Sequence, residues 1–315
     1  MQTPLTPLDF LRRARKLHGG RTAVVDGEDR WTYAEFGTRC DRASVAWARL
    51  GVGVGDRVGT IAPNTHQHLE QFYAVPQLGA VIVPMNYRLT PDDFVYLANH
   101  SGCKVLCVHA DYLDAVDGVR AQMTTVQHFV ALEGDRPGWL RYEDLLAEAD
   151  PADVVPVTVD ENDLIAINYT SGTTARPKGV EMTHRNLWLN ASVFGWQTGV
   201  NDRDVYLHTL PMFHCNGWGM PYAVTAMGGK HIVLRKVDGH EILRRIQQHG
   251  VSQQLEDRRS VVHGRVGSDV GLGQRGIGGE AAVCGTLKHQ IASRRQQAPV
   301  ERTWMFDAPD LPLRY

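Results

Sequence analysis

Short apolar runs and amphipathic segments alternate along the first 250 residues, and this alternation predicts a layered α/β fold. The apolar runs predicted as strands are Thr22–Val25, Val58–Ala62, Ala80–Pro84, Val105–Val108, Phe129–Leu132, Leu164–Tyr169, Val205–Leu210 and His231–Leu234. The segments predicted as helices are Leu8–Leu17, Tyr33–Leu50, Leu69–Leu78, Tyr112–Met123, Tyr142–Glu148, one beginning at Thr90, one in the apolar stretch Trp218–Met227 and one ending at Gly250.

Residues at the ends of these segments support the predicted boundaries. Thr32 can cap a helix through its hydroxyl group, and Gly51 stands just past the end of the same helix. The run Thr90-Pro91-Asp92-Asp93 combines a hydroxyl cap, a proline in the first turn and acids at the positive end of the helix dipole. The pair Asp26-Gly27 predicts a tight turn after the first strand.

The pattern changes at Val251. Residues 251–315 are crowded with Arg, Gln and Gly, and they show no sustained period of a strand or a helix. We therefore expect a partial domain at 1–250 and an atypical tail at 251–315, which is either out of frame or disordered. Translation of the downstream reading frames tests the first possibility.

Composition and charge exclude several classes of protein. The chain has 315 residues, 43% hydrophobic and 22% charged, with a formal net charge of -2, so it lacks the basic surface typical of nucleic-acid binding. No apolar run is long enough to span a bilayer, and the N-terminus lacks the features of a secretory signal. Its five scattered cysteines predict buried free thiols (Cys40, Cys103, Cys107, Cys215 and Cys284). These features favour a cytoplasmic protein.

The run after Leu164, LIAINYTSGTTARPKGVEMTHRN, predicts a loop that can bind phosphate. Gly172 lets backbone amides turn inward, nearby hydroxyl groups can donate to phosphate oxygens, and Lys178 adds a positive charge. The run is not a Walker A loop, because Pro177 stands where that pattern needs glycine and Gly179 follows the lysine. On composition alone, a polar turn that binds no ligand remains an alternative.

The string YTSGTTARPKGV resembles the signature YTSGTTGxPKGV of the AMP-forming acyl-CoA synthetases, a family that includes the luciferases and nonribosomal adenylation domains. The resemblance implies that a carboxylate attacks the α-phosphate of ATP, with Mg²⁺, and that coenzyme A then displaces AMP. It implies catalytic roles for Thr173 and Lys178. The residues that it implies for nucleotide binding are Thr170, Ser171, Gly172, Thr173, Thr174, Lys178 and Gly179. Ala175 departs from the usual glycine and would weaken the loop if its φ had to be positive.

A second run, Leu210-Pro211-Met212-Phe213-His214-Cys215-Asn216-Gly217-Trp218, follows a predicted strand. By itself it is compatible with a strand, a turn and a helix packed around Phe213, with His214 in the core. It also resembles the P-x-F-H motif of medium- to long-chain acyl-CoA synthetases, which implies a substrate pocket lined by His214, Asn216, Gly217 and Trp218. We do not expect His214 to act as a general base, because a carboxylate substrate is already ionised at pH 7.

Other upstream runs predict scaffold roles only. The stretches Gly55–Val58, Pro63-Asn64 and Val83–Leu89 also match the family and read as turns and caps. His66 and His68 alternate without a third metal ligand in view, so we expect them to be solvated, and we predict no metal ligands among the protein side chains.

The resemblance covers roughly residues 8 to 250 and then stops. The remaining family motifs are absent: Y-G-x-T-E, Y-R-T-G-D and the lysine of a C-terminal lid domain. The sequence therefore predicts an incomplete N-terminal domain of a fatty-acid–CoA ligase, acting on small molecules and without a transmembrane segment. Two alternatives stay open: a non-catalytic remnant that at most binds nucleotide, and a relative that loads a carrier protein.

Overall fold

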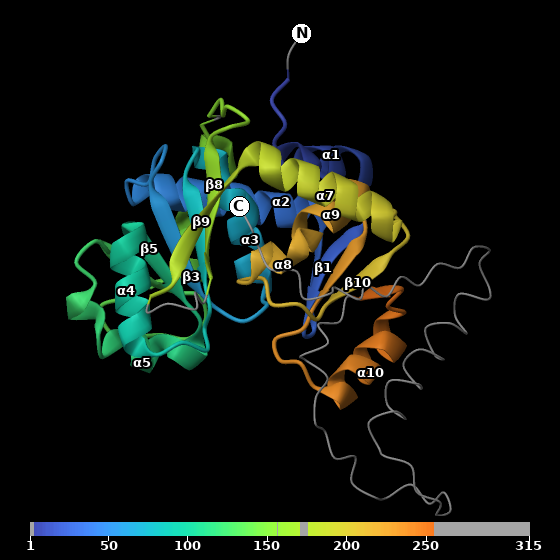
Figure 1. Cartoon of the computed structure of the whole chain (residues 1–315). Coiled ribbons are helices and arrows are strands. Elements are labelled where there is room, and N and C mark those ends of the chain that lie inside the picture. The colour runs from blue at the N-terminus through green and yellow to red at the C-terminus, as the bar shows by residue number, and fades with distance from the viewer. Residues whose placement is uncertain (1–2, 156, 171–175, 255–315) are drawn as a thin grey trace, which may run out of the picture. The chain divides into compact units, whose positions relative to one another are not determined.

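Two β-sheets and the helices packed on them build the part of the chain that the structure describes, which is residues 3–155, 157–170 and 176–254 of a computed structural model (Figure 1). In the seven-stranded sheet the order is β7-β6-β5-β3-β4-β8-β9. Its strands are β3 (Arg57–Ile61), β4 (Val81–Met85), β5 (Cys103–Val108), β6 (His128–Ala131), β7 (Leu140–Arg141), β8 (Leu164–Thr170) and β9 (Lys178–Thr183). All neighbours in it are parallel except β8 and β9, which form an antiparallel edge.

The five-stranded sheet has the order β12-β10-β11-β1-β2. Its strands are β1 (Thr22–Asp26), β2 (Asp29–Thr32), β10 (Val205–His208), β11 (Lys230–Val233) and β12 (Gln253–Gln254). The expected turn at Asp26-Gly27 joins β1 to β2, and Gly27 has the positive φ of 65° that this turn needs. All eight strands predicted from the sequence are present, with ends displaced by no more than two residues.

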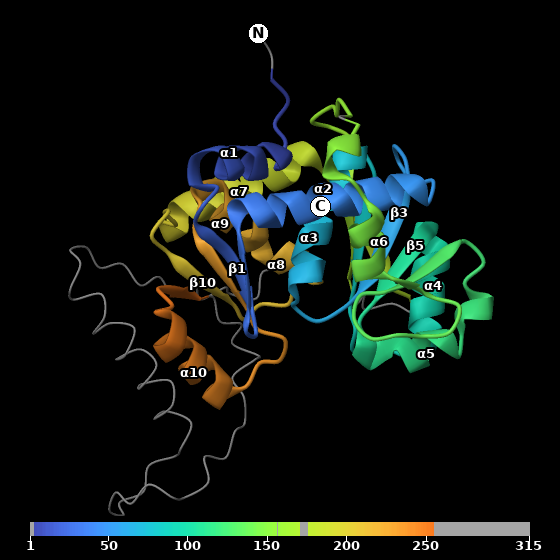
Figure 2. The same cartoon turned by 180° about the vertical axis from the view of Figure 1, so that it is seen from behind.

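Helices pack on and between the two sheets. They are α1 (Leu8–His18), α2 (Tyr33–Arg49), α3 (His66–Ala74), α4 (Pro91–Ser101), α5 (Leu113–Asp117), α6 (Tyr142–Glu148), α7 (His184–Thr198), α8 (Cys215–Trp218), α9 (Met220–Met227) and α10 (Gly239–His249). Four short 3₁₀ turns lie at Pro76–Leu78, Ala110–Tyr112, Arg120–Gln122 and Pro151–Asp153. From behind, α2 runs from the five-stranded sheet towards α6 and the seven-stranded sheet (Figure 2). Among the described residues, no helix is long and apolar enough to cross a membrane.

The predicted helix caps are confirmed. Thr32 and Glu35 form a capping box at the start of α2, and Thr90 and Asp93 form another at the start of α4. The predicted helix at Tyr112–Met123 is wrong, because the segment breaks into α5 and 3₁₀ turns. Only two side chains of α5 are buried, too few for the continuous apolar stripe that would stabilise a longer helix.

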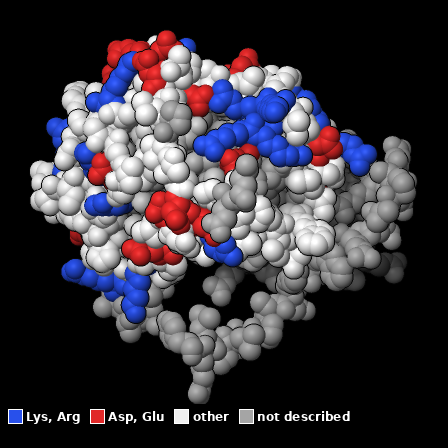
Figure 3. Space-filling model, turned by 90° about the horizontal axis from the view of Figure 1, so that it is seen from above, with Lys and Arg blue, Asp and Glu red and all other residues white. Residues whose placement is uncertain are grey.

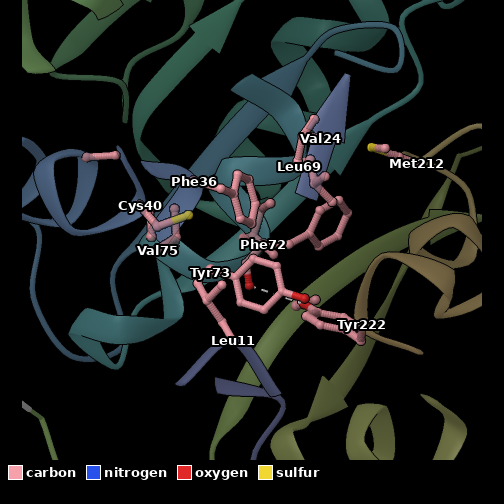
Figure 4. Close-up of a cluster of buried hydrophobic side chains, with 14 of the residues drawn as sticks. Leu11, Val24, Phe36, Cys40, Leu69, Phe72, Tyr73, Val75, Met212 and Tyr222 are labelled. Atoms are coloured by element: carbon pink, nitrogen blue, oxygen red, sulfur yellow. Dashed lines mark hydrogen bonds between the residues drawn. The ribbon is translucent and has the colours of Figure 1, made fainter. Parts of the chain in front are cut away.

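The main core lies where α1, α2, α3 and α9 meet β1 (Figure 4). Aromatic side chains fill it: the ring of Phe36 meets Tyr73 edge-on at 5.9 Å, and Phe72 and Tyr73 meet Tyr222 at 5.7 and 5.6 Å. The hydroxyl of Tyr73 donates to the carbonyl of Pro221 over 3.0 Å, so its polar end is satisfied inside the core. This packing fixes the helices on which the segment after Leu210 rests.

The expectation that His66 and His68 are solvated is wrong, because α3 lies inside the fold and buries both. Nδ1 of His66 lies 2.8 Å from the buried carboxylate of Asp26. Nδ1 of His68 lies 3.2 Å from the carbonyl of Pro63, and its ring stacks on Phe72. Burial lowers the pKa of His68 to about 4, so this side chain is neutral at pH 7.

The prediction of buried thiols is confirmed for Cys40, Cys103 and Cys107 and wrong for Cys215, which is exposed. Cys215 follows the exposed His214 in a segment that lies outside the regular strands, so no sheet covers it. Cys284 lies outside the described residues.

One guanidinium group links the carboxyl ends of the two sheets. Arg235, just after β11, pairs with Asp26 at the end of β1 over 3.0 Å and with Glu133, just after β6, over 2.7 Å. The side chain of Asp26 is almost completely buried, and its pKa is held far below the usual range by His66 and Arg235 in spite of burial, which acts in the opposite direction.

Candidate functional site

The predicted phosphate loop connects the antiparallel strands β8 and β9. Thr170 pairs in register with Lys178, so the two residues face each other where the connection begins and ends. Both are exposed, as is Gly179. Ser171, Gly172, Thr173, Thr174 and Ala175 lie outside the described residues.

Helix α4 holds both sides of this connection. The hydroxyl of Tyr96 donates to the carbonyl of Pro177 over 3.2 Å, and the guanidinium of Arg176 lies 5.1 Å from the centre of the Tyr96 ring. On the other strand, Nδ1 of His100 lies 2.7 Å from the hydroxyl of Tyr169. The entrance and exit of the connection are therefore attached to one helix of the scaffold.

Gly179 lies opposite Tyr169 in the hairpin. A Cβ atom at this position would come within 3.0 Å of Ile167 and 3.4 Å of the Tyr169 ring. A larger residue beside Lys178 would therefore push against the strand that leads into the connection.

The side chain of Asn64 fixes the start of the second predicted site segment. Its amide nitrogen donates to the carbonyls of His208 and Leu210 over 2.9 and 3.0 Å, and its amide oxygen accepts from the backbone N–H of Met212 over 2.8 Å. Asn64 follows β3 of the seven-stranded sheet, whereas His208 ends β10 of the five-stranded sheet. The segment that carries His214 thus begins at a junction of the two sheets.

Asn168 connects the two predicted site segments. It lies on β8, two residues before Thr170, and its buried amide nitrogen donates to the carbonyl of Phe213 over 3.1 Å. Its amide oxygen is buried without a partner. Since Phe213 directly precedes His214, one side chain ties the strand that enters the phosphate loop to the predicted acid pocket.

The backbone of the next five residues is left-handed. Cys215, Asn216 and Trp218 have φ values of 47°, 49° and 60°, and Gly217 and Gly219 have φ values of 59° and 75°. Among the described residues, Cys215, Asn216 and Trp218 are the only non-glycine residues with positive φ. Left-handed backbone is unfavourable for residues with a Cβ atom, and such strain clusters at functional sites.

The four predicted pocket residues divide into two pairs. His214 and Trp218 are exposed, and Trp218 meets the ring of Phe194 at 6.0 Å. Asn216 and Gly217 are buried, and neither polar atom of the Asn216 amide has a hydrogen-bond partner. A buried amide without partners is unusual in a folded protein.

Sequence reasoning missed the residues that position this site. The sequence places Asn64 in a turn and Asn168 in a strand, and it predicts no role at the site for either. A polar residue inside the apolar run LIAINY was the signal for Asn168. The buried histidines His208 and His231 stack with their ring nitrogens 2.9 Å apart, and no pattern in the sequence predicts this contact.

The donors around the connection suit an anion better than a metal ion. Thr170 supplies a hydroxyl group and Lys178 an ammonium group, both exposed. Within the described ranges, no group of three His, Cys, Asp or Glu side chains could hold a metal.

Comparison with known proteins decides the family. The sequence profile described as "AMP-binding enzyme" matches residues 10–253. This chain belongs to that family. It is 41% identical over 240 residues to a long-chain-fatty-acid–CoA ligase of Thermus thermophilus, a match that covers 74% of this chain and 44% of the ligase. It is 35% identical over 266 residues to a peroxisomal butyrate–CoA ligase of Arabidopsis thaliana, covering 79% of this chain and 46% of that protein.

Solved structures of the AMP-binding family share the same fold. A putative long-chain-fatty-acid CoA ligase from Rhodopseudomonas palustris matches 82% of this chain with a TM-score of 0.76 at 27% identity, over 64% of its own length. A fatty acyl CoA synthetase of Mycobacterium tuberculosis matches 79% of this chain with a TM-score of 0.71 at 28% identity, over 48% of its own length. The chain spans about half the length of the curated relatives that it matches. The expected fold, that of the N-terminal domain of adenylate-forming enzymes, is confirmed.

Proposed function

We propose that this chain is the nucleotide-binding part of a fatty-acid–CoA ligase, with ATP at the connection between β8 and β9 and the acid beside His214. The observation that carries the proposal is the pairing of Thr170 with Lys178 at the mouth of a connection whose sequence is YTSGTTARPKG. The names of the relatives, a long-chain-fatty-acid–CoA ligase and a butyrate–CoA ligase, support the substrate class.

In the proposed reaction, a carboxylate oxygen of the acid forms a bond to the α-phosphorus of ATP while the bond from that phosphorus to pyrophosphate breaks. The thiol sulfur of coenzyme A then attacks the acyl carbon, and the bond from that carbon to AMP breaks. Lys178 and the hydroxyl groups of Thr170, Ser171, Thr173 and Thr174 would hold the phosphates as charge moves onto pyrophosphate. Asn168 and Asn64 would keep the acid segment next to this loop.

Magnesium, when bound with the triphosphate, would offset part of its negative charge. The described residues at the connection fit phosphate groups but offer no ready set of carboxylate ligands for the ion. His214 is exposed and would contact the acid without accepting a proton, since the acid is ionised at neutral pH.

Pyrophosphate release tests the proposal. The purified chain is incubated with ATP, Mg²⁺ and saturated acids of increasing length, beside Lys178→Ala and the charge-preserving Lys178→Arg. ATP binding is measured on the same samples by equilibrium dialysis. Loss of one charge-assisted hydrogen bond is worth about 1.5–3 kcal/mol, so K178A should bind ATP about 10- to 100-fold more weakly.

The outcomes separate the alternatives. Acid-dependent pyrophosphate release that K178A abolishes supports the ligase, and addition of coenzyme A or of a phosphopantetheine carrier then identifies the acceptor. ATP binding that depends on Lys178, without turnover, supports a nucleotide-binding protein that does not catalyse. ATP affinity that is absent or equal in K178A would refute both. The proposed boundary of the family fold at residue 250 moves to β12, because Gln253 and Gln254 pair with β10 and the family match ends at residue 253; we propose that the atypical part of the sequence begins after this strand.

A further inference from the structure

A groove of about 570 Å³ lies between β2, α2 and α6, and we call it the α2 groove. Seen from behind, α2 crosses the face of the molecule, with β1 below one end and α6 below the other (Figure 2). The lining of the groove includes the arginines Arg30, Arg39 and Arg42 and the apolar side chains of Trp31 and Leu146. None of its lining residues belongs to either of the two predicted site segments.

The carboxylates that line the α2 groove already have hydrogen-bond partners. Glu35 accepts from the backbone N–H and the hydroxyl group of Thr32 over 2.7 and 2.8 Å, as part of the capping box of α2. Glu143 accepts from Arg39 over 2.7 Å, and the same guanidinium group pairs with the buried carboxylate of Glu70. The charge of Arg39 is therefore offset by two carboxylates of the protein itself.

Arg30 and Arg42, in contrast, have no carboxylate partner in the part of the chain that the structure describes. The side chain of Arg30 is exposed and makes no hydrogen bond or ion pair there. Arg42 is half-buried, and its Nη1 donates to the carbonyl of Leu146 over 2.9 Å, which leaves its other N–H groups free. The unused hydrogen bonds of the groove are thus mainly those of positively charged donors, which suit an anion.

Other basic side chains on the surface are paired with acids. In α1, Arg12 pairs with Asp9 over 2.8 Å and Arg15 with Asp41 over 2.6 Å. Seen from above, red acidic side chains lie among the blue basic ones (Figure 3). The formal net charge of the chain is -2, so the unpaired arginines of the α2 groove do not result from a generally basic protein.

A phosphate group matches two separate guanidinium groups better than a carboxylate does. Arg30 comes from β2 and Arg42 from α2, and each guanidinium can donate to two oxygens at once. A phosphate has more terminal oxygens and more charge than a carboxylate, so it can accept from both arginines. Stacking of an aromatic base on Trp31 is not favoured, because His66 stacks on this ring at 4.2 Å and Arg39 lies 5.5 Å from its centre.

We propose that the α2 groove binds a phosphate-bearing anion, with Arg30 and Arg42 donating to its phosphate oxygens. Free pyrophosphate and the diphosphate of a nucleotide offer the same chemistry to these two arginines, and a comparison of pyrophosphate with ADP distinguishes them. The groove shares no residue with the connection between β8 and β9, so this site does not depend on the proposed ligase function.

Isothermal titration calorimetry of the full chain with inorganic pyrophosphate tests the proposal. All titrations use the Lys178→Ala background, which removes the charge proposed to hold phosphate at the connection between β8 and β9. The test variants are Arg30→Gln and Arg42→Gln. The matched control is Arg203→Gln, which removes an exposed arginine outside the groove that pairs with no carboxylate among the described residues. Circular dichroism checks that all variants are folded.

We expect K178A to bind pyrophosphate, R203Q to leave its affinity unchanged, and R30Q and R42Q each to weaken it about 10-fold, as for the loss of one charge-assisted hydrogen bond. Absence of binding in K178A would overturn the proposal, as would an affinity that both groove variants leave unchanged. Equal weakening by R203Q would reveal a nonspecific effect of charge and also overturn it.

Two further ligands are titrated in the same background. ADP that binds as tightly as pyrophosphate, with the same dependence on Arg30 and Arg42, identifies a nucleotide as the ligand, and weaker binding of ADP identifies the free anion. Citrate carries carboxylates in place of phosphates. Tighter binding of citrate than of pyrophosphate would overturn the assignment of phosphate to this groove.

Discussion

The left-handed turn after His214 predicts an unusual response to glycine. Cys215 has a φ of 47°, a conformation that disfavours any side chain with a Cβ atom. Replacing it by glycine removes this cost, whereas replacing it by alanine keeps it. Because both changes remove the thiol, the comparison of Cys215→Gly with Cys215→Ala isolates the effect of the backbone.

The magnitude follows from two opposing effects. Left-handed backbone costs roughly 1–2 kcal/mol for a residue with a Cβ atom. Glycine loses more conformational freedom on folding, and this costs about 0.5–1 kcal/mol relative to alanine. C215G should therefore exceed C215A in unfolding free energy by up to about 1.5 kcal/mol, and each 1 kcal/mol corresponds to about 2–4 °C in Tm for a domain of this size.

Urea unfolding followed by circular dichroism measures the difference directly. The same comparison at Trp218, with a φ of 60°, should have the same sign. At Ala191, inside the right-handed helix α7, the change to glycine should have the opposite sign and serves as the control. If C215A proves more stable than C215G, the turn is not left-handed in solution and the reasoning is wrong.

Three further predictions concern the scaffold of the site. Asn64→Ala removes three hydrogen bonds and should lower the unfolding free energy by about 3 kcal/mol in urea titrations, whereas a change below about 1 kcal/mol would contradict the role given to this side chain. Gly59→Val should destabilise by about 1–3 kcal/mol, because a Cβ atom there would lie 2.8 Å from Leu106 and 2.9 Å from Cys103; an unchanged melting temperature would argue against this packing. Acid should also destabilise the fold, because burial lowers the pKa of His68 to about 4 and that of His231 to about 3, so below about pH 6.5 the unfolded imidazoles bind protons that the folded ones do not. Each of these two histidines should lower the unfolding free energy by about 1.4 kcal/mol per pH unit between pH 6.5 and its folded pKa. An unfolding free energy that does not change with pH over this range, measured by urea titration, would refute this.

The regular part of the fold could be predicted because local patterns agree with tertiary packing. Thr32 and Thr90 cap the helices that they were expected to cap, and the apolar runs became strands. Helix α7 was missed because it has apolar residues on both sides, so its sequence shows no stripe of period 3.6. The strand β9 was missed because its first four residues are exposed and follow a loop motif.

The candidate site could be predicted only in part, because a sequence motif identifies the residues that contact a ligand and not the residues that position those side chains. Lys178 is predicted from the residues of the loop, whereas the role of His214 is predicted only by resemblance. The hydrogen bonds of Asn64 and Asn168 depend on how the two sheets meet, which no local pattern records. The predicted solvation of His66 and His68 failed for the same reason: their burial is decided by elements distant in the sequence.

The three-way contact of Arg235 with Asp26 and Glu133 has a consequence for natural variation in this protein. A lysine at this position would offer a single point charge and could not hydrogen-bond to both carboxylates through a planar group. One of the two acids would then lose its guanidinium partner and keep only its histidine, His66 for Asp26 or His109 for Glu133. We therefore expect the arginine to be lost without harm only if that acid changes with it. We therefore expect correlated substitutions at positions 26, 133 and 235 among close homologues.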